Sequence, residues 1–128
     1  MVVLVINEDF LLRKLVCTFF EMNGYKVVEA RSYAEGYMRA NAYKPQALVI
    51  DNILDSVSCL ATCKKIQSLP NMETAEFVIF TNYENELLDT SSIKLKGTLT
   101  KPYILSKLRE YFPPLNREYP PDTSYYIH

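Results

Sequence analysis

The sequence predicts a doubly wound α/β domain, in which a five-stranded parallel sheet carries helices on both faces. Short runs of apolar and β-branched residues alternate with longer segments whose apolar residues recur at helical spacing. Residues 2–6 are continuously apolar, as a strand buried on both faces requires. The chain has 128 residues, 48% of them hydrophobic and 23% charged, which suits one domain with its own core.

The chain begins with a predicted strand, helix and second strand. Residues 2–6 form the first strand, and residues 10–22 form a helix because leucine, valine and phenylalanine recur on one face. Residues 23–24, Asn-Gly, end this helix, since glycine adopts the left-handed cap conformation without a Cβ clash. Residues 25–30 then form the second strand.

The second helix and third strand are bounded by clear signals. Ser32 is the predicted N-cap of a helix over residues 33–42, with Glu35 at the capping-box position. Pro45 prevents continuation, and residues 47–50 form a third strand that ends at Asp51.

The second half of the chain repeats the alternation, and residues 83–93 are only weakly helical. Strongly apolar or β-branched runs predict two more strands, and helical spacing predicts two more helices. The predicted elements are a helix over 57–69 closed by Pro70, a strand over 77–80, a strand over 96–100 and a helix over 103–111. Right-handed crossovers then place the helices on both faces of the sheet.

Paired prolines set the end of the chain apart from this pattern. Residues 113–128 contain Pro113-Pro114, Pro120-Pro121 and several tyrosines. Such a segment favours extended backbone, so we expect a domain over residues 1–112 followed by a linker or a strapped-down arm over 113–128.

Charge and composition narrow the function classes. A net charge of −1 gives no basic surface for nucleic acid or an anionic membrane. No apolar run approaches the roughly 20 residues that span a bilayer, and we expect a soluble, cytoplasmic protein. Cys59 and Cys63 lie four residues apart, which leaves a metal site open, but the sole histidine is His128. We therefore expect these thiols and Cys17 to be small buried residues in a reducing compartment.

Polar residues leave the carboxyl ends of the predicted strands, where an open parallel sheet binds its ligands. Glycine-rich phosphate loops and nucleophile elbows are missing from the sequence. The strand ends instead deliver carboxylates, a hydroxyl and an ammonium, from Asn7, Glu8, Asp9, Asp51, Thr81 and Lys101. Cysteine-dependent, nucleophile-elbow and P-loop chemistries are therefore unsupported.

Five segments, taken in order, resemble the receiver domains of response regulators, the CheY-like domains of two-component signalling. The segments are 3–9 with Arg13, 24–30, 44–51, 77–81 and 99–103. The resemblance covers almost the whole chain before the tail. It implies a flavodoxin-like fold with strand order 2-1-3-4-5.

The resemblance also implies the chemistry of the site. Asp51 would accept a phosphoryl group, Thr81 would donate its hydroxyl to a phosphoryl oxygen, and Lys101 would supply a compact positive charge. Mg²⁺ would bridge oxygens in the transfer. Its expected ligands are Glu8, Asp51, Asn7 and the backbone carbonyl of Ile53. The peptide between Lys101 and Pro102 would be cis, as in the family.

Several positions depart from the family pattern. Receivers usually offer two acids at the end of the first strand, and here the pair is Asn7-Glu8, which weakens or reshapes a metal site. Thr98 stands where an aromatic switch residue is expected, and Asn82 where a small residue is typical. These changes bear on the switch more than on the acceptor.

Two function classes follow from the sequence. The first is a phosphoacceptor switch, not a turnover enzyme, that takes a phosphoryl group from a sensor histidine kinase or phosphotransfer protein and acts on a downstream effector protein. The second is a pseudo-receiver that binds partners without phosphorylation. A small hydrolase or nucleotide-binding protein of similar fold ranks third. Asp51 could also be a strand-end carboxylate in a turn, Glu8 an ion-pair partner of Lys101, and a homodimer stays open.

Overall fold

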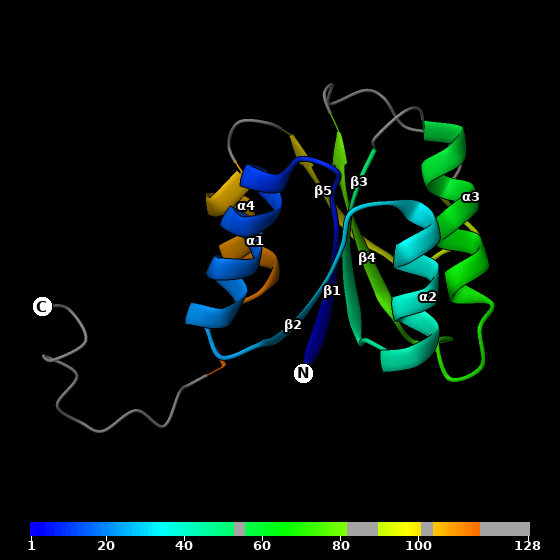
Figure 1. Cartoon of the computed structure of the whole chain (residues 1–128), viewed down its shortest axis with the longest axis horizontal. Coiled ribbons are helices and arrows are strands. Elements are labelled where there is room, and N and C mark those ends of the chain that lie inside the picture. The colour runs from blue at the N-terminus through cyan, green and yellow to red at the C-terminus, as the bar shows by residue number, and fades with distance from the viewer. Residues whose placement is uncertain (53–55, 82–89, 101–103, 116–128) are drawn as a thin grey trace, which may run out of the picture.

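The fold is a three-layer α/β sandwich (Figure 1). The computed structural model describes residues 1–52, 56–81, 90–100 and 104–115. Its elements are β1 (Val2–Ile6), α1 (Phe10–Met22), β2 (Lys26–Ala30), α2 (Tyr33–Tyr43), β3 (Ala47–Asp51), α3 (Ser56–Gln67), β4 (Glu76–Thr81), β5 (Leu95–Thr100) and α4 (Ile104–Tyr111). α1 and α4 cover one face of the sheet, and α2 and α3 cover the other (Figure 1).

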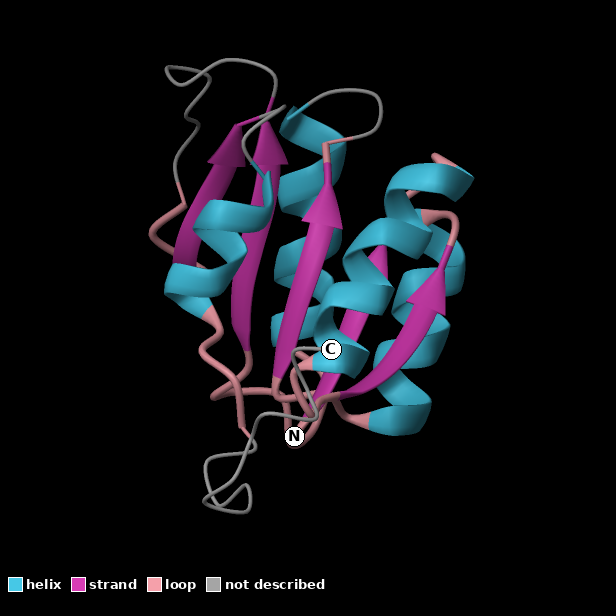
Figure 2. Cartoon of the chain, turned by 90° about the vertical axis from the view of Figure 1, so that its left-hand side faces the viewer, coloured by secondary structure: helices cyan, strands magenta, loops and turns pink. Residues whose placement is uncertain are grey.

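The sheet confirms the predicted topology. All four strand pairs are parallel, and the order is β2-β1-β3-β4-β5. The arrowheads of the strands therefore point to one end of the molecule (Figure 2). The chain runs outward from β1 to β2 and then crosses back to β3, so the strand order reverses between β1 and β3. In such sheets this reversal opens a crevice at the carboxyl ends of the strands.

The central strands are apolar because both of their faces are buried. β3 is buried along its whole length, and β1 is buried from its second residue onward. Alternate residues belong to two core clusters, one under α2 and α3 and the other under α1 and α4. Leu4 and Leu48 belong to the first cluster, and Val5 and Val49 to the second.

The helix boundaries follow from their caps. The predicted bounds of α1 are confirmed, and Asp9 is its N-cap, accepting a hydrogen bond from the Leu12 N–H at 3.2 Å. α2 begins where Ser32 was predicted to cap it, and it ends one residue later than predicted. Within the described ranges, no helix combines the length and the hydropathy needed to cross a bilayer.

α3 starts one residue earlier and ends two residues earlier than predicted, and the side chain of its last residue, Gln67, bonds the segments that follow. Its amide nitrogen donates to the carbonyls of Met72 at 2.6 Å and Ala75 at 3.1 Å. Its amide oxygen accepts from the Lys94 N–H at 2.8 Å. Gln67 thus joins the end of α3 to the segments that precede β4 and β5.

An aromatic cluster closes the amino-terminal end of the sheet, at the end of α1. The ring of Phe20 lies edge-on to the rings of Phe19, Tyr25 and Phe112, at centroid distances of 5.3, 5.4 and 4.9 Å. The Tyr25 hydroxyl donates to the Pro113 carbonyl at 2.8 Å. One step further, the Leu115 N–H donates to the Asn23 carbonyl at 2.9 Å. The chain that follows α4 is therefore tied to the domain as far as Leu115.

Candidate functional site

The carboxyl ends of β1 and β3 bring two of the predicted site residues side by side. Ile6 pairs with Ile50, so the next residues, Asn7 and Asp51, leave the sheet at the same level. Asp51 pairs in turn with Phe80 on β4, which puts Thr81 one position further out. The parallel register thus gathers Asn7 and Asp51 at the point where the strand order reverses, between β1 and β3. It places Thr81 next to them, at the end of β4.

These three side chains are the buried polar residues of the described chain. Asn7 is 0% exposed, Asp51 7% and Thr81 5%. A carboxylate placed among apolar strands is costly unless polar groups or cations surround it. A buried Asp51 at the end of a central strand therefore needs polar groups or a cation close by.

Asn7 presents an unpaired donor beside Asp51. The Asp9 N–H donates to Asn7 Oδ1 at 2.9 Å, which fixes the orientation of the amide. Asn7 Nδ2 is buried, and no hydrogen-bond partner for it exists within the described chain. Asn7 thus presents an N–H donor to the site and has already used its amide oxygen once. Glu8, by contrast, is exposed at the rim.

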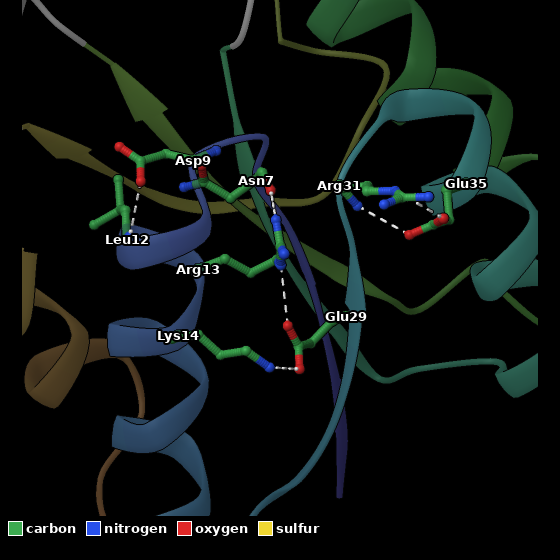
Figure 3. A network of polar contacts seen from close by, with 8 residues as sticks. All are labelled: Asn7, Asp9, Leu12, Arg13, Lys14, Glu29, Arg31 and Glu35. Carbon is green, nitrogen blue, oxygen red and sulfur yellow. Dashed lines mark hydrogen bonds and ion pairs between the residues drawn. The ribbon is translucent and has the colours of Figure 1, made fainter.

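A network of polar contacts holds the β1–α1 junction in place (Figure 3). Arg13 on α1 donates from Nη1 to the Asn7 carbonyl at 2.7 Å and from Nε to Glu29 on β2 at 3.0 Å. Lys14 contacts the other oxygen of Glu29 at 2.7 Å. The hydrogen bond from Lys14 lowers the pKa of Glu29, partial burial opposes the shift, and the bond from Arg13 adds to it. The Asn7 backbone is therefore fixed by α1 and, through Glu29, by the neighbouring strand.

Two residues of this region were not predicted from the sequence. One is Arg13, which the sequence offered only as part of the family resemblance. The other is Tyr33, whose hydroxyl donates to the backbone carbonyl of Asp51 at 2.7 Å. A side chain that bonds a distant backbone group leaves no periodic signal in a sequence. The sequence shows only that a tyrosine follows the predicted N-cap of a helix, which does not indicate the group that its hydroxyl bonds.

Part of the predicted site lies outside the described residues. This holds for Lys101, for the Ile53 carbonyl, for Asn82 and for the predicted cis peptide between Lys101 and Pro102. Their roles remain predictions.

The donor set of the described residues fits Mg²⁺ in kind but is small. Mg²⁺ is held by oxygen ligands, commonly one or two carboxylates with waters. Asp51 and Glu8 are the carboxylates predicted to hold it, and a neutral amide stands at Asn7. Among the residues that the structure describes, no group of three histidine, cysteine or acidic side chains could hold a metal. The site therefore has less negative charge than a site with two acids at the end of β1.

The three cysteines are buried and free, as predicted. Burial, with a smaller contribution from Glu29, raises the pKa of Cys17 from 9.0 to about 12. A hydrogen bond with Cys59, followed by burial, raises the pKa of Cys63. These shifts favour the protonated form of Cys17 and Cys63, which is the less nucleophilic form of a thiol.

The comparisons with known proteins agree with this architecture. The family described as the response regulator receiver domain matches residues 3–112. No match is found among curated proteins. Among solved structures, the chain resembles a CheY-like receiver domain from Methylobacillus flagellatus, with a TM-score of 0.75 and 22% identity over 86% of this chain and 93% of that one.

Two other solved structures are similar in fold. The chemotaxis protein CheY4 of Vibrio cholerae has a TM-score of 0.75 and 16% identity, over 85% of this chain and 92% of that one. The receiver domain of a sensor histidine kinase from Pseudomonas aeruginosa has a TM-score of 0.70 and 14% identity, over 85% and 91%. That structure has a magnesium ion coordinated in its active-site cleft.

The match to the family spans most of the chain, and the predicted fold, strand order and family resemblance are all confirmed. The family consists of signalling modules of two-component systems, in which magnesium and an aspartyl phosphate are typical. This chain belongs to the response regulator receiver domain family.

Proposed function

We propose that this receiver domain accepts a phosphoryl group on Asp51 from a sensor histidine kinase or phosphotransfer protein and thereby controls a downstream effector protein. The observation that carries the proposal is the buried carboxylate of Asp51 at the end of β3, beside Asn7 and close to Thr81. Central strands place a carboxylate there only at a considerable desolvation cost. A carboxylate with a chemical role explains why this cost is tolerated, whereas a carboxylate that only forms a turn does not require burial.

The proposed reaction is a simple transfer. An oxygen of Asp51 forms a bond to phosphorus while the bond between phosphorus and the donor histidine nitrogen breaks, and the electron pair stays on that nitrogen. The protein contributes mainly position and charge neutralisation. Thr81 would donate its hydroxyl to a phosphoryl oxygen, Asn7 Nδ2 offers a second donor, and Lys101 would supply positive charge. Mg²⁺, which Glu8, Asp51, the Asn7 amide oxygen and the Ile53 carbonyl would hold, would offset charge on the phosphoryl oxygens.

Phosphodonor chemistry tests the acceptor directly. Incubation with acetyl phosphate and Mg²⁺ is expected to add one phosphoryl group, detected by intact-mass analysis. Asp51→Asn is expected to abolish the adduct. Asp9→Asn is the matched control, because Asp9 lies at the same edge and asparagine keeps the helix cap. An unmodified wild type, or an unchanged adduct in Asp51→Asn, would remove the proposal.

A second candidate, a pseudo-receiver that binds partners without phosphorylation, is favoured by the neutral Asn7. Metal binding separates the two functions. Asn7→Asp adds a carboxylate beside Asp51, and one unit charge at about 4 Å is worth roughly 1–4 kcal/mol at effective dielectric constants of 80 to 20. Calorimetric titration should therefore show Mg²⁺ binding at least about fivefold tighter in Asn7→Asp. If wild type binds no Mg²⁺ at millimolar concentrations and takes up no phosphoryl group, the pseudo-receiver is the better description.

The proposed domain comprises residues 1–112, and the segment over 113–128 is a tail outside the switch. Two hydrogen bonds that tie residues 113–115 to Tyr25 and Asn23 support an arm strapped to the domain at its start. The balanced charge gives no support for direct nucleic-acid binding, so the proposed partners are proteins.

A further inference from the structure

The peptide group that follows the candidate acceptor is held from both sides. The Asn52 N–H donates to the Phe80 carbonyl on β4 at 3.3 Å. In a trans peptide the carbonyl points opposite to the N–H, so the Asp51 carbonyl points away from β4 and toward β1. β1 has ended at Ile6, one level below Asp51. At this point the hydroxyl of Tyr33 donates to the Asp51 carbonyl at 2.7 Å.

Tyr33 is itself well placed for this contact. It is the first residue of α2, which begins at the same end of the sheet as the site (Figure 1). The cap of α2 fixes its backbone: the Ser32 side chain accepts from the Glu35 N–H at 3.1 Å, and the Glu35 carboxylate accepts from the N–H of Arg31, just before the cap, at 3.0 Å. Its half-buried ring packs against the core cluster under α2 and α3. A tyrosine held at both ends loses little further entropy when its hydroxyl bonds Asp51.

We propose that Tyr33 is a positioning residue for the Asp51 carboxylate: by holding the peptide plane after Asp51 against α2, it sets the direction in which the carboxylate meets the phosphoryl group. The inference rests on the proposed function of Asp51. Phosphoryl transfer depends strongly on alignment of the attacking oxygen, and small displacements reduce its rate. Without the Tyr33 hydroxyl, the peptide is held by the longer Asn52 bond on the β4 side and has greater freedom toward β1.

A packing role makes a different prediction, because Tyr33 also lines a groove between α2 and α3. This groove has a volume of about 430 Å³ and is lined by Tyr33, Ala34, Tyr37, Met38, Thr62 and Lys65. Tyr33→Phe keeps the ring in the groove and removes only the hydroxyl. Tyr37→Phe is the matched control, because it removes a hydroxyl from the same groove one turn later, and Tyr37 is not hydrogen-bonded to Asp51.

The experiment measures phosphorylation of wild type, Tyr33→Phe and Tyr37→Phe by acetyl phosphate with Mg²⁺, over a series of donor concentrations and by intact mass. Loss of one hydrogen bond corresponds to roughly a two- to tenfold change. The maximal rate of Tyr33→Phe should fall by about this factor, with the half-saturating concentration unchanged. Tyr37→Phe should match wild type. Equal rates in the two variants would overturn the positioning role.

A second measurement reports the contact without phosphorylation. In backbone NMR, the carbonyl carbon shift of Asp51, read through the Asn52 N–H, should move in Tyr33→Phe and stay in place in Tyr37→Phe. An unchanged shift in Tyr33→Phe would show that the hydrogen bond is not formed, and it would overturn the inference. A wild type that takes up no phosphoryl group would overturn the proposed function instead, whatever the carbonyl shift shows.

Discussion

The two ends of the sheet are built from different kinds of residue. At the amino-terminal end, the rings of Phe19, Phe20, Tyr25 and Phe112 pack edge to face, and the Tyr25 hydroxyl bonds the departing chain. At the carboxyl-terminal end, buried polar side chains meet, and the amide nitrogen of Asn7 has no partner in the described chain. The first end gains free energy from apolar burial, and the second gives some of it up.

The two ends of the sheet therefore have different roles: the amino-terminal end contributes to the stability of the fold, and the carboxyl-terminal end carries the candidate reactive groups. A buried donor without a partner costs about 1–3 kcal/mol. Apolar packing elsewhere must supply at least that amount. Substitutions in the aromatic cluster should therefore act mainly on folding, whereas substitutions of the buried polar side chains themselves should act mainly on reactivity.

Phe20→Ala is expected to have the largest effect on stability. The ring is fully buried and contacts three others, and truncation of a buried phenylalanine costs roughly 3–5 kcal/mol. Urea unfolding followed by circular dichroism measures the loss. The fraction that stays folded should still accept a phosphoryl group from acetyl phosphate. A loss below about 1 kcal/mol would contradict the separation of the two ends.

Arg13→Ala should have the next largest effect, because it acts at the polar end on folding as well as on the site. The Arg13 side chain is 11% exposed and bonds both the Asn7 carbonyl and Glu29, so its removal should cost about 1–3 kcal/mol. Lys14→Ala is the control, since Lys14 bonds the same carboxylate but is 49% exposed. That variant should lose less than about 1 kcal/mol. Equal losses in urea unfolding would show that the Asn7 contact contributes nothing.

Tyr25→Phe sharpens the comparison at the other end. It keeps the ring in the aromatic cluster and removes the hydrogen bond to the Pro113 carbonyl, at a cost of roughly 0.5–1.5 kcal/mol. Amide exchange should become faster at Leu115, whose N–H bonds the Asn23 carbonyl nearby. Exchange as slow as in wild type would mean that the Asn23 bond alone fixes this part of the chain.

The smallest expected effect comes from Glu29→Gln. The folded-state pKa of Glu29 lies below its ordinary value of 4.5, mainly because Lys14 donates to it. The carboxylate therefore stabilises the fold above pH 4.5, and this contribution is lost as the pH falls through the lowered value. Glu29 is 35% exposed, so the loss at pH 7 should stay below about 1 kcal/mol. Wild type and Glu29→Gln should become equally stable at low pH, and a difference that persists there would contradict the assignment.

The sequence predicted the fold well because each element carries its own boundary signal. α1 starts at the Asp9 cap and ends before Gly24, whose φ of 90° needs a residue without a Cβ. The end of α3 was predicted less well. Pro70 predicts that the helix ends at residue 69, whereas the observed helix ends at Gln67. The side chain of Gln67 bonds carbonyls in the segment before β4, and such contacts across loops leave no local pattern in the sequence.

The candidate site was predicted in its strand-end residues and missed in its supports. Asn7, Asp51 and Thr81 follow apolar strands, and parallel strands bring their ends together, so their gathering follows from the pattern. Arg13 bonds the backbone carbonyl of Asn7, six residues before it, and Tyr33 bonds that of Asp51, 18 residues after it. Nothing in hydrophobic periodicity specifies which distant carbonyl a long polar side chain reaches.

The attachment of Pro113 and Leu115 beside Tyr25 and Asn23 has a mechanical consequence for signal output. Pro113 and Leu115 are bound at the amino-terminal end of the sheet, whereas Asp51 lies at the carboxyl-terminal end of β3, a strand of five residues or roughly 17 Å in length. A change at Asp51 can reach Pro113 and Leu115 through the body of the domain, because Asn23 and Tyr25, which hold them, lie between α1 and β2.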